Sequence, residues 1–157
     1  MREATGTRRP LIAAGLLLGS GMGGFLDGIV FHQLLQVHNM LTGRRPKESI
    51  ASIEINMFWD GVFHAFTWVL TAVAIAMLWR ATRRTDVVQS GRTLLGSIIT
   101  GWGAFNLIEG VIDHHILHLH HVVEALGVSV WDWVFLASGV LLIALGAGLI
   151  ASDRRRQ

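Results

Sequence analysis

Four long apolar segments dominate this chain and limit what it can fold into. They cover about residues 11–37, 55–79, 93–119 and 131–151. Each is long enough to cross a hydrocarbon core of about 30 Å, which takes about 20 helical residues. With 157 residues, of which 52% are hydrophobic and 15% charged, the chain is also too apolar for an ordinary soluble domain. We therefore predict an all-α fold, a single integral membrane four-helix bundle that uses residues 1–157 and runs up-down-up-down.

Basic residues gather at the ends of the predicted segments. Ten of the 13 Lys and Arg residues lie on one side of the membrane, whereas Arg44, Arg45 and Lys47 lie on the other. By the positive-inside rule, both termini are cytoplasmic and the chain is a multi-pass protein of the cell inner (plasma) membrane. The same distribution argues against a nucleic-acid surface, although the formal net charge is +2. The lipid bilayer is therefore the expected partner.

Small residues recur every four positions in the first segment and form two ladders. Gly15, Gly19 and Gly23 lead to Asp27, and Ser20, Gly24 and Gly28 lead to His32. Small residues at this spacing let helices approach closely in a bilayer. The ladders predict close helix packing, either within the bundle or between copies in a homo-oligomer. Each ladder ends in an ionisable group, which packing alone does not explain.

An acid, a glycine, aliphatic residues and a histidine recur in the same order in three segments. The three copies are Phe25–His32, Phe58–His64 and Leu107–His114. Asp60 and His64 are four residues apart and share a helical face, whereas Asp27 and His32 are five apart and point about 140° away from each other on a straight α-helix. Either His32 contacts another neighbour, or a local π-bulge brings it to Asp27.

The acids and histidines of these copies lie at one depth. Counted at 1.5 Å per residue, they fall within about 10 Å of one level in the outer third of the membrane, on the periplasmic or extracellular side. A charged side chain at membrane depth costs on the order of 3 kcal/mol unless it is paired or ligated. The stretch Trp102–Glu124 alone carries five of the eight histidines and three carboxylates. This concentration predicts a compensating cation, and hence a metal-binding, histidine-rich site.

We expect the metal to be held by carboxylates and imidazoles from three segments. The predicted metal ligands are Asp60, His64, Glu109, Asp113 and His114, with Asp27 and His32 as further ligands or as partners that orient the ligands, and His118 at the mouth. The chain has no cysteine, so any metal must be bound by nitrogen and oxygen. Such ligands suit a divalent transition metal (iron, copper or zinc), as a single ion or a dinuclear pair, and argue against a copper(I) carrier.

Two other interpretations stay open. A haem b would use two histidines, for instance His64 and His114, and would leave the carboxylates unexplained. A metal-free network of Asp, His and Asn side chains would hold the bundle together or conduct protons, without enzymatic activity. If the site is catalytic, we expect a metal-dependent oxidoreductase or hydrolase that acts on a small or lipid-soluble substrate. No nucleophile pattern is evident, because Ser129 and Ser138 lack a partner, and catalytic residues are not assigned.

The same motifs are similar to those of a bacterial family of small four-helix integral membrane proteins that is classed as a domain of unknown function. The resemblance covers Gly23 to about Gly148. It depends on Asp27-Gly28 with His32, on Phe58-Trp59-Asp60-Gly61 with His64, and on Asn106-Leu107-Ile108-Glu109-Gly110 with Asp113-His114-His115. The resemblance implies the fold and the membrane location but indicates no reaction.

Overall fold

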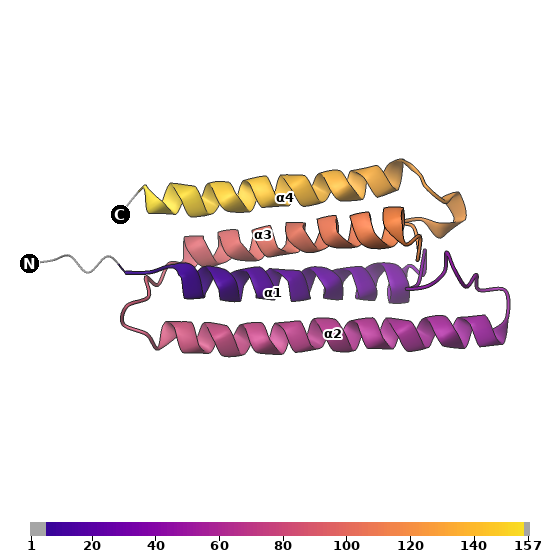
Figure 1. Ribbon diagram of the computed structural model, residues 1–157, viewed down its shortest axis with the longest axis horizontal. Coiled ribbons are helices and arrows are strands. Elements are labelled where there is room, and N and C mark those ends of the chain that lie inside the picture. The colour runs from indigo at the N-terminus through magenta and orange to yellow at the C-terminus, as the bar shows by residue number, and fades with distance from the viewer. Residues whose placement is uncertain (1–5, 156–157) are drawn as a thin grey trace, which may run out of the picture.

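The structure is a computed structural model that describes residues 6–155. Four long helices form a single bundle (Figure 1). Their bounds, with the shorter helical turns between them, are α1 (Arg9–Asp27), the π-helix η1 (Gly28–Leu34), α2 (Ile50–Thr82), α3 (Gly91–Glu109), the π-helix η2 (Gly110–Ile116), the short 3₁₀-helix η3 (Glu124–Leu126) and α4 (Val130–Arg154). The predicted all-helical, four-segment fold is confirmed.

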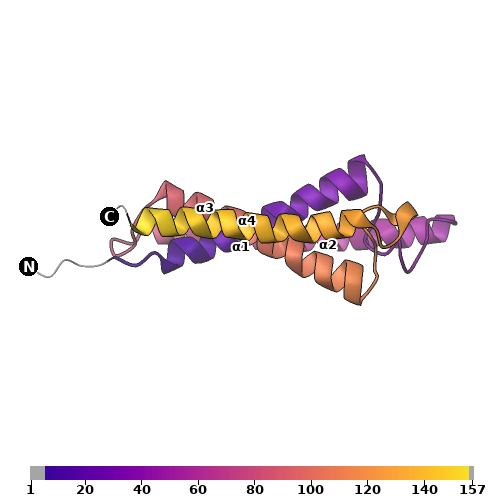
Figure 2. The same ribbon diagram turned by 90° about the horizontal axis from the view of Figure 1, so that it is seen from above.

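The helices are arranged around a central crossing pair. Figure 1 shows consecutive helices running in opposite directions, with the ends of the chain together on one side and the connections 35–49 and 117–129 on the other. We call the second side the loop end. Seen from above, α1 and α3 cross (Figure 2). Helix α2 packs against α1, and α4 packs against α3. The bundle is thus two helix pairs that meet at α1 and α3.

The four candidate membrane spans are Arg9–Leu34, Ile50–Thr82, Gly91–Ile116 and Val130–Arg154. Their existence follows from length and hydropathy, but their ends follow from local chemistry. Helix α2 begins five residues before its predicted start because the Ser49 side chain accepts a hydrogen bond from the Ser52 N–H and caps it. The third span ends at Ile116, which is the last residue of the π-helix η2.

Burial is inverted relative to a water-soluble protein. Large apolar side chains such as Phe58, Trp68 and Trp79 are exposed on the outer faces of the helices. The largest fully buried side chains are instead His32, His38, His114 and His120. A bilayer solvates the apolar exterior, and the polar groups then have to satisfy one another inside the bundle.

Close contact between α1 and α3 depends on glycine. A Cβ atom at Gly19 would collide with the carbonyl of Ile98, and one at Gly101 would collide with the carbonyl of Leu16. The predicted small-residue ladders therefore serve packing within the chain. Association into a homo-oligomer stays a prediction.

The contacts of these glycines reveal an internal repeat with a spacing of 82 residues. Every boundary of α3–η2 lies 82 residues after that of α1–η1: Arg9 corresponds to Gly91, Asp27 to Glu109, and Leu34 to Ile116. The backbone then takes a positive φ at equivalent positions, Gln36 (53°) and His118 (48°). The two units are related by an approximate two-fold axis between α1 and α3. The predicted second copy, around Asp60, lies in regular α-helix and is not part of this symmetry.

Candidate metal centre

Both π-helices bring a carboxylate and a histidine together. In a π-helix, hydrogen bonds join residues five apart, so Asp27 and His32 no longer point in different directions. Asp27 Oδ2 lies 3.2 Å from His32 Nε2. In the second unit, donor atoms of Glu109 and His114 lie within 4.8 Å of each other. The structure contains both alternatives that the sequence left open, because the π-helix brings His32 to Asp27 and His32 also contacts Asp60.

Four imidazoles converge at the loop end, two from each unit. His32 and His114 come from the π-helices, and His38 and His120 come from the segments that follow them. Ring centroids are 4.6 Å apart for His38 and His120, 4.7 Å for His32 and His38, and 4.9 Å for His114 and His120. Each of the four residues is at most 1% exposed. Together with Asp27 and Glu109, these histidines form what we call the central cluster.

The Nδ1 atom of each imidazole faces an acceptor, and the contacts are reciprocal. His38 Nδ1 donates to the Val122 carbonyl (2.9 Å), and His120 Nδ1 donates to the Met40 carbonyl (3.2 Å). Met40 and Val122 are themselves 82 residues apart. A carbonyl oxygen only accepts, so Nδ1 carries the proton in His38 and His120. Their Nε2 atoms therefore present lone pairs to the centre of the cluster.

Carboxylates face Nδ1 of the other two rings, with a hydrogen bond at His32 and a close approach without hydrogen-bond geometry at His114. His32 Nδ1 lies 3.0 Å from Asp60 Oδ1, and His114 Nδ1 lies 3.2 Å from Asp132 Oδ1. Asp60 also accepts hydrogen bonds from the Met40 N–H (2.8 Å) and from the Asn39 side chain. A carboxylate behind an imidazole fixes its tautomer and makes it a stronger ligand.

Asp132 has two functions at the start of α4. Its Oδ2 accepts a hydrogen bond from the Ser129 N–H (2.8 Å), which completes a capping box. Its Oδ1 accepts one from the Val122 N–H (3.1 Å) and also faces His114. The helix cap thus fixes both an imidazole and the backbone segment that holds His38.

The inward atoms of the cluster lack hydrogen-bond partners. Within residues 6–155 this holds for Nε2 of His38 and His120 and for both carboxylate oxygens of Glu109. His32 Nε2 and Asp27 Oδ2 face each other at 3.2 Å but without the geometry of a hydrogen bond. A buried polar atom without a partner costs about 1–3 kcal/mol. Two overlapping sets have donor atoms within 4.8 Å of one another: His32, His38 and His120, and Glu109, His114 and His120. These are donor sets of the kind that hold a transition metal.

The two histidines in the segments after the π-helices, His38 and His120, are electrically neutral. Burial lowers the pKa of His38 to about 3, and the neighbouring His120 contributes to the shift. Burial likewise lowers the pKa of His120 to about 3, with His114 contributing. Both rings are therefore unprotonated at Nε2 at neutral pH, which is the form that binds metals.

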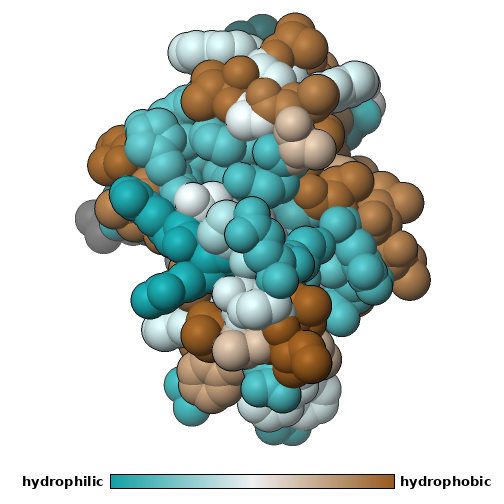
Figure 3. Space-filling view, turned by 90° about the vertical axis from the view of Figure 1, so that its right-hand side faces the viewer, coloured by the Kyte–Doolittle hydropathy of each residue, from teal (hydrophilic) through white to brown (hydrophobic). Residues whose placement is uncertain are grey.

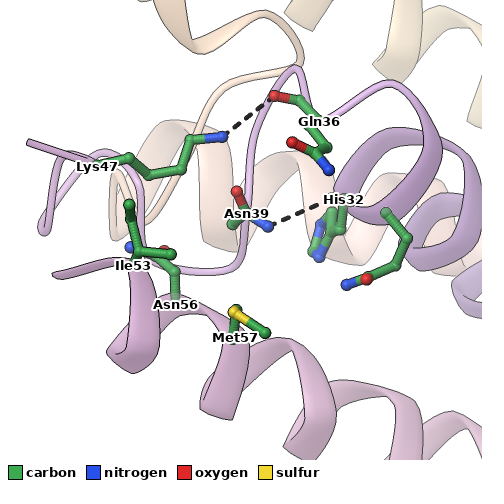
Figure 4. Close-up of a pocket in the computed structure, with 8 residues that line it drawn as sticks. His32, Gln36, Asn39, Lys47, Ile53, Asn56 and Met57 are labelled. Carbon is green, nitrogen blue, oxygen red and sulfur yellow. Dashed lines mark hydrogen bonds between the residues drawn. The ribbon is translucent and has the colours of Figure 1, made fainter. Parts of the chain in front are cut away.

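Polar side chains connect the cluster to the loop end. In a space-filling view of that end, hydrophilic residues occupy the middle, with apolar residues above, below and to one side (Figure 3). A cavity of about 170 Å³ lies beside His32 (Figure 4). Asn39 donates to the His32 carbonyl there, and Lys47 donates to the Gln36 carbonyl. This cavity gives a small polar molecule a path to the edge of the cluster.

The structure brings half of the predicted ligands into the central cluster, namely Asp27, His32, Glu109 and His114. Asp60 lies one layer behind, against His32. His64 lies elsewhere, because its Nδ1 donates to the Asp60 carbonyl of its own helix (2.8 Å). Asp113 lines a cavity beside Glu109. His118 is exposed, and its nearest ring partner is His121, at 5.9 Å.

Neither His38 nor His120 is among the ligands predicted from the sequence. The signal that identifies both is the repeat itself: an acid, a glycine, a histidine four residues after the glycine, and a second histidine six residues further. Only the first and third copies of the motif have this second histidine.

The fold and the cluster define a helical integral membrane protein with a buried histidine–carboxylate centre. The chain belongs to the family described as "Predicted membrane protein (DUF2243)", whose family model matches residues 14–153. The resemblance noted from the motifs is thereby confirmed. No curated protein and no solved structure matches the chain.

Proposed function

We propose that this protein is a membrane metalloprotein whose central cluster holds a divalent transition metal. Nε2 of His32, His38 and His120 supplies the first site, and Glu109 with His114 offers donors for a second ion beside it. Nitrogen and oxygen donors without sulfur suit iron, copper or zinc. Asp60, Asp132 and the two carbonyls orient the rings from behind.

One observation carries this proposal: the Nε2 lone pairs of His38 and His120 face the same space. Both rings donate through Nδ1 to carbonyls, so neither Nε2 has a proton to share. Two neutral acceptors cannot hydrogen-bond each other, and neither Nε2 atom has a hydrogen-bond partner among the described residues. A cation that accepts both lone pairs removes the conflict. This argues against the metal-free network.

The packing of the rings also bears on haem. A haem lies between its axial ligands, whereas the His38 and His120 rings stack at 4.6 Å with an interplanar angle of 9°. Direct contact between these two imidazoles leaves no space for a porphyrin between them, although the haem alternative suggested from the sequence uses His64 and His114. A bare ion fits this arrangement better.

A redox or hydrolytic role depends on what reaches the metal. A bound ion would supply a Lewis acid or, for iron and copper, an electron acceptor. We favour a metal-dependent oxidoreductase that acts on a lipid-soluble substrate, because an apolar cavity open to the lipid face reaches Glu109. The distribution of Arg and Lys supports a position of the cluster on the periplasmic or extracellular side of the plasma membrane.

Metal analysis of the purified protein tests the proposal. After reconstitution and removal of free metal, elemental analysis should find about one or two ions per chain, and the absorption spectrum should lack a haem band. His120→Gln removes a donor common to both sets and should abolish retention. His118→Gln, at an exposed ring, is the matched control and should retain the wild-type content. Wild-type protein without stoichiometric metal, or His120→Gln with full content, would overturn the proposal.

A further inference from the structure

Two cavities flank the crossing pair and are related by the repeat. One, of about 280 Å³, is lined by Leu26, Asp27 and Trp102. The other, of about 380 Å³, lies between α2 and α3 and is lined by the equivalent residues Ile108 and Glu109 and by Ser20. Each cavity therefore approaches the central cluster through one of its two carboxylates.

The repeat shows which residues make the cavities unequal. Trp102 fills part of the smaller cavity, whereas the equivalent residue in the larger one is Ser20. Phe31 lines the smaller cavity, whereas its equivalent, Asp113, lines the larger. The α2/α3 cavity is thus both wider and equipped with a second carboxylate.

The carboxylates of the α2/α3 cavity need hydrogen-bond donors. Glu109 is 4% exposed, and neither of its oxygens has a hydrogen-bond partner among the described residues. One metal-bound oxygen would still leave the other free. Asp113 makes no side-chain hydrogen bond to residues 6–155. An occupant that satisfies these groups must bring a hydroxyl or similar donor.

The other residues that line the α2/α3 cavity indicate the chemistry of the rest of the ligand. Phe63, Phe66 and Phe105 line the cavity, and Phe66 and Ile108 are exposed on the outer face. Aromatic walls favour an aromatic ring, which packs against them in offset or edge-to-face geometry. The volume lies in the range of about 300–1,000 Å³ typical of small-molecule sites. The opening faces lipid, so the occupant arrives from the bilayer.

We propose that the α2/α3 cavity binds the ring of a lipid-soluble phenol of the hydroquinone type, whose hydroxyl donates to Asp113, beside Glu109. The ring lies among the three phenylalanines, and the alkyl tail extends past Ile108 into the bilayer. The binding site itself depends only on the cavity, whereas its use as a substrate site rests on the proposed metal centre. The smaller cavity, which has Phe31 in place of Asp113, does not take this ligand.

Anaerobic titration of the full chain in detergent with 2-decylhydroquinone tests the site. The dimethyl ether of the probe keeps the ring and tail but lacks the donors, so it should bind at least about 10-fold more weakly. Asp113→Asn should narrow this difference. Equal affinity for the two compounds in the wild type, or an unchanged difference in Asp113→Asn, would overturn the role of the carboxylate.

The repeat supplies a matched pair of blocking variants. Ile108→Trp narrows the α2/α3 cavity and should weaken binding of the probe about 10-fold, whereas Leu26→Trp at the equivalent position of the smaller cavity should leave it unchanged. Equal effects of the two variants would overturn the assignment. Metal content is measured on the same samples, with and without reconstitution. Binding of the probe by metal-free protein would support the cavity site even if the metal proposal failed. Metal retention without binding of the probe would overturn the cavity site alone.

Discussion

At the scale of single residues, the central cluster depends on atoms that its own chain neighbours do not supply. His38 is fixed by the Val122 carbonyl of the second unit, and His120 by the Met40 carbonyl of the first. Each unit therefore orients a ring of the other. Positions of the four Nε2 atoms follow from these outer contacts more than from the helices that carry the rings.

Substitution of Asp60 is the clearest test of whether the groups behind the imidazoles orient them. Asp60→Asn keeps the size of the side chain but weakens its contact with His32 Nδ1, so metal affinity should fall about 10–100-fold. Competition with a chelator of known affinity measures the change. Asp86→Asn, at an exposed acid in the connection between α2 and α3, is the control. Unchanged affinity in Asp60→Asn would refute a role for this carboxylate in orienting the ligand.

The low pKa of His38 and His120 predicts how acid affects the stability of the metal-free protein. Their pKa is about 3 in the fold and about 6.5 when exposed, so the unfolded chain binds more protons between these values. The stabilisation is complete above about pH 6.5 and is lost as the pH falls towards 3. The thermal midpoint should therefore drop between pH 7 and 5. The drop should be smaller in His120→Gln than in His118→Gln, and equal drops would contradict the shifted pKa.

Four ligand candidates could be recognised from the sequence because an acid and a histidine close together inside an apolar segment demand a partner. Asp27, His32, Glu109 and His114 belong to this group. His38 and His120 could not be placed in the same way, since the chain leaves the helix and reverses at Gln36 and His118, both with positive φ. Where a loop residue lies after such a reversal is decided by contacts with distant segments.

At the scale of elements, hydropathy predicts that a span exists but not how it ends. Segment lengths reflect the thickness of the bilayer, which explains why four spans were found. The sequence predicts the π-helix η1 only as one of two alternatives, because five-residue spacing is equally consistent with separate partners, and it does not predict η2. The structure brings each acid and its histidine to the same pocket, and the π-helical turn is what makes this possible.

Removal of one residue from η1 tests the function of that turn. Deleting Ile29 places Asp27 and His32 four residues apart, which suits an α-helix, and shifts the following His38 by one position. Metal retention should fall at least about 10-fold, because three donors of one unit lose their register. The same deletion at exposed Thr85, in the connection between α2 and α3 at the opposite end of the bundle, should have a smaller effect on retention, measured by elemental analysis. A larger loss from the second deletion would contradict the assignment.

The α1–α3 crossing makes a separate prediction about stability. Gly101→Ala places a methyl group against the Leu16 carbonyl, and overpacking of this kind costs about 1–3 kcal/mol. Gly148→Ala adds a methyl group where nothing lies within 4 Å, so it should change stability by less than about 0.5 kcal/mol. Thermal unfolding in detergent compares the two variants. A Gly101→Ala protein as stable as Gly148→Ala would contradict the close crossing.

At the scale of the whole molecule, orientation in the membrane can be tested because the chain has no cysteine. Arg45→Cys, in the connection between η1 and α2, should react with an impermeant maleimide added outside intact cells. Arg84→Cys, between α2 and α3, should react only after the membrane is opened. The reverse pattern would place the cluster on the cytoplasmic side.

The two-fold relation between α1–η1 and α3–η2 has a consequence for ancestry. A helical hairpin of about half this length, pairing with an identical copy, would have assembled the same pocket from two sets of three donors. Once the two copies were joined in one chain, their sequences could diverge. The residue pairs Ser20/Trp102 and Asp113/Phe31 record this divergence, since the two flanking cavities now differ in volume and in their carboxylates.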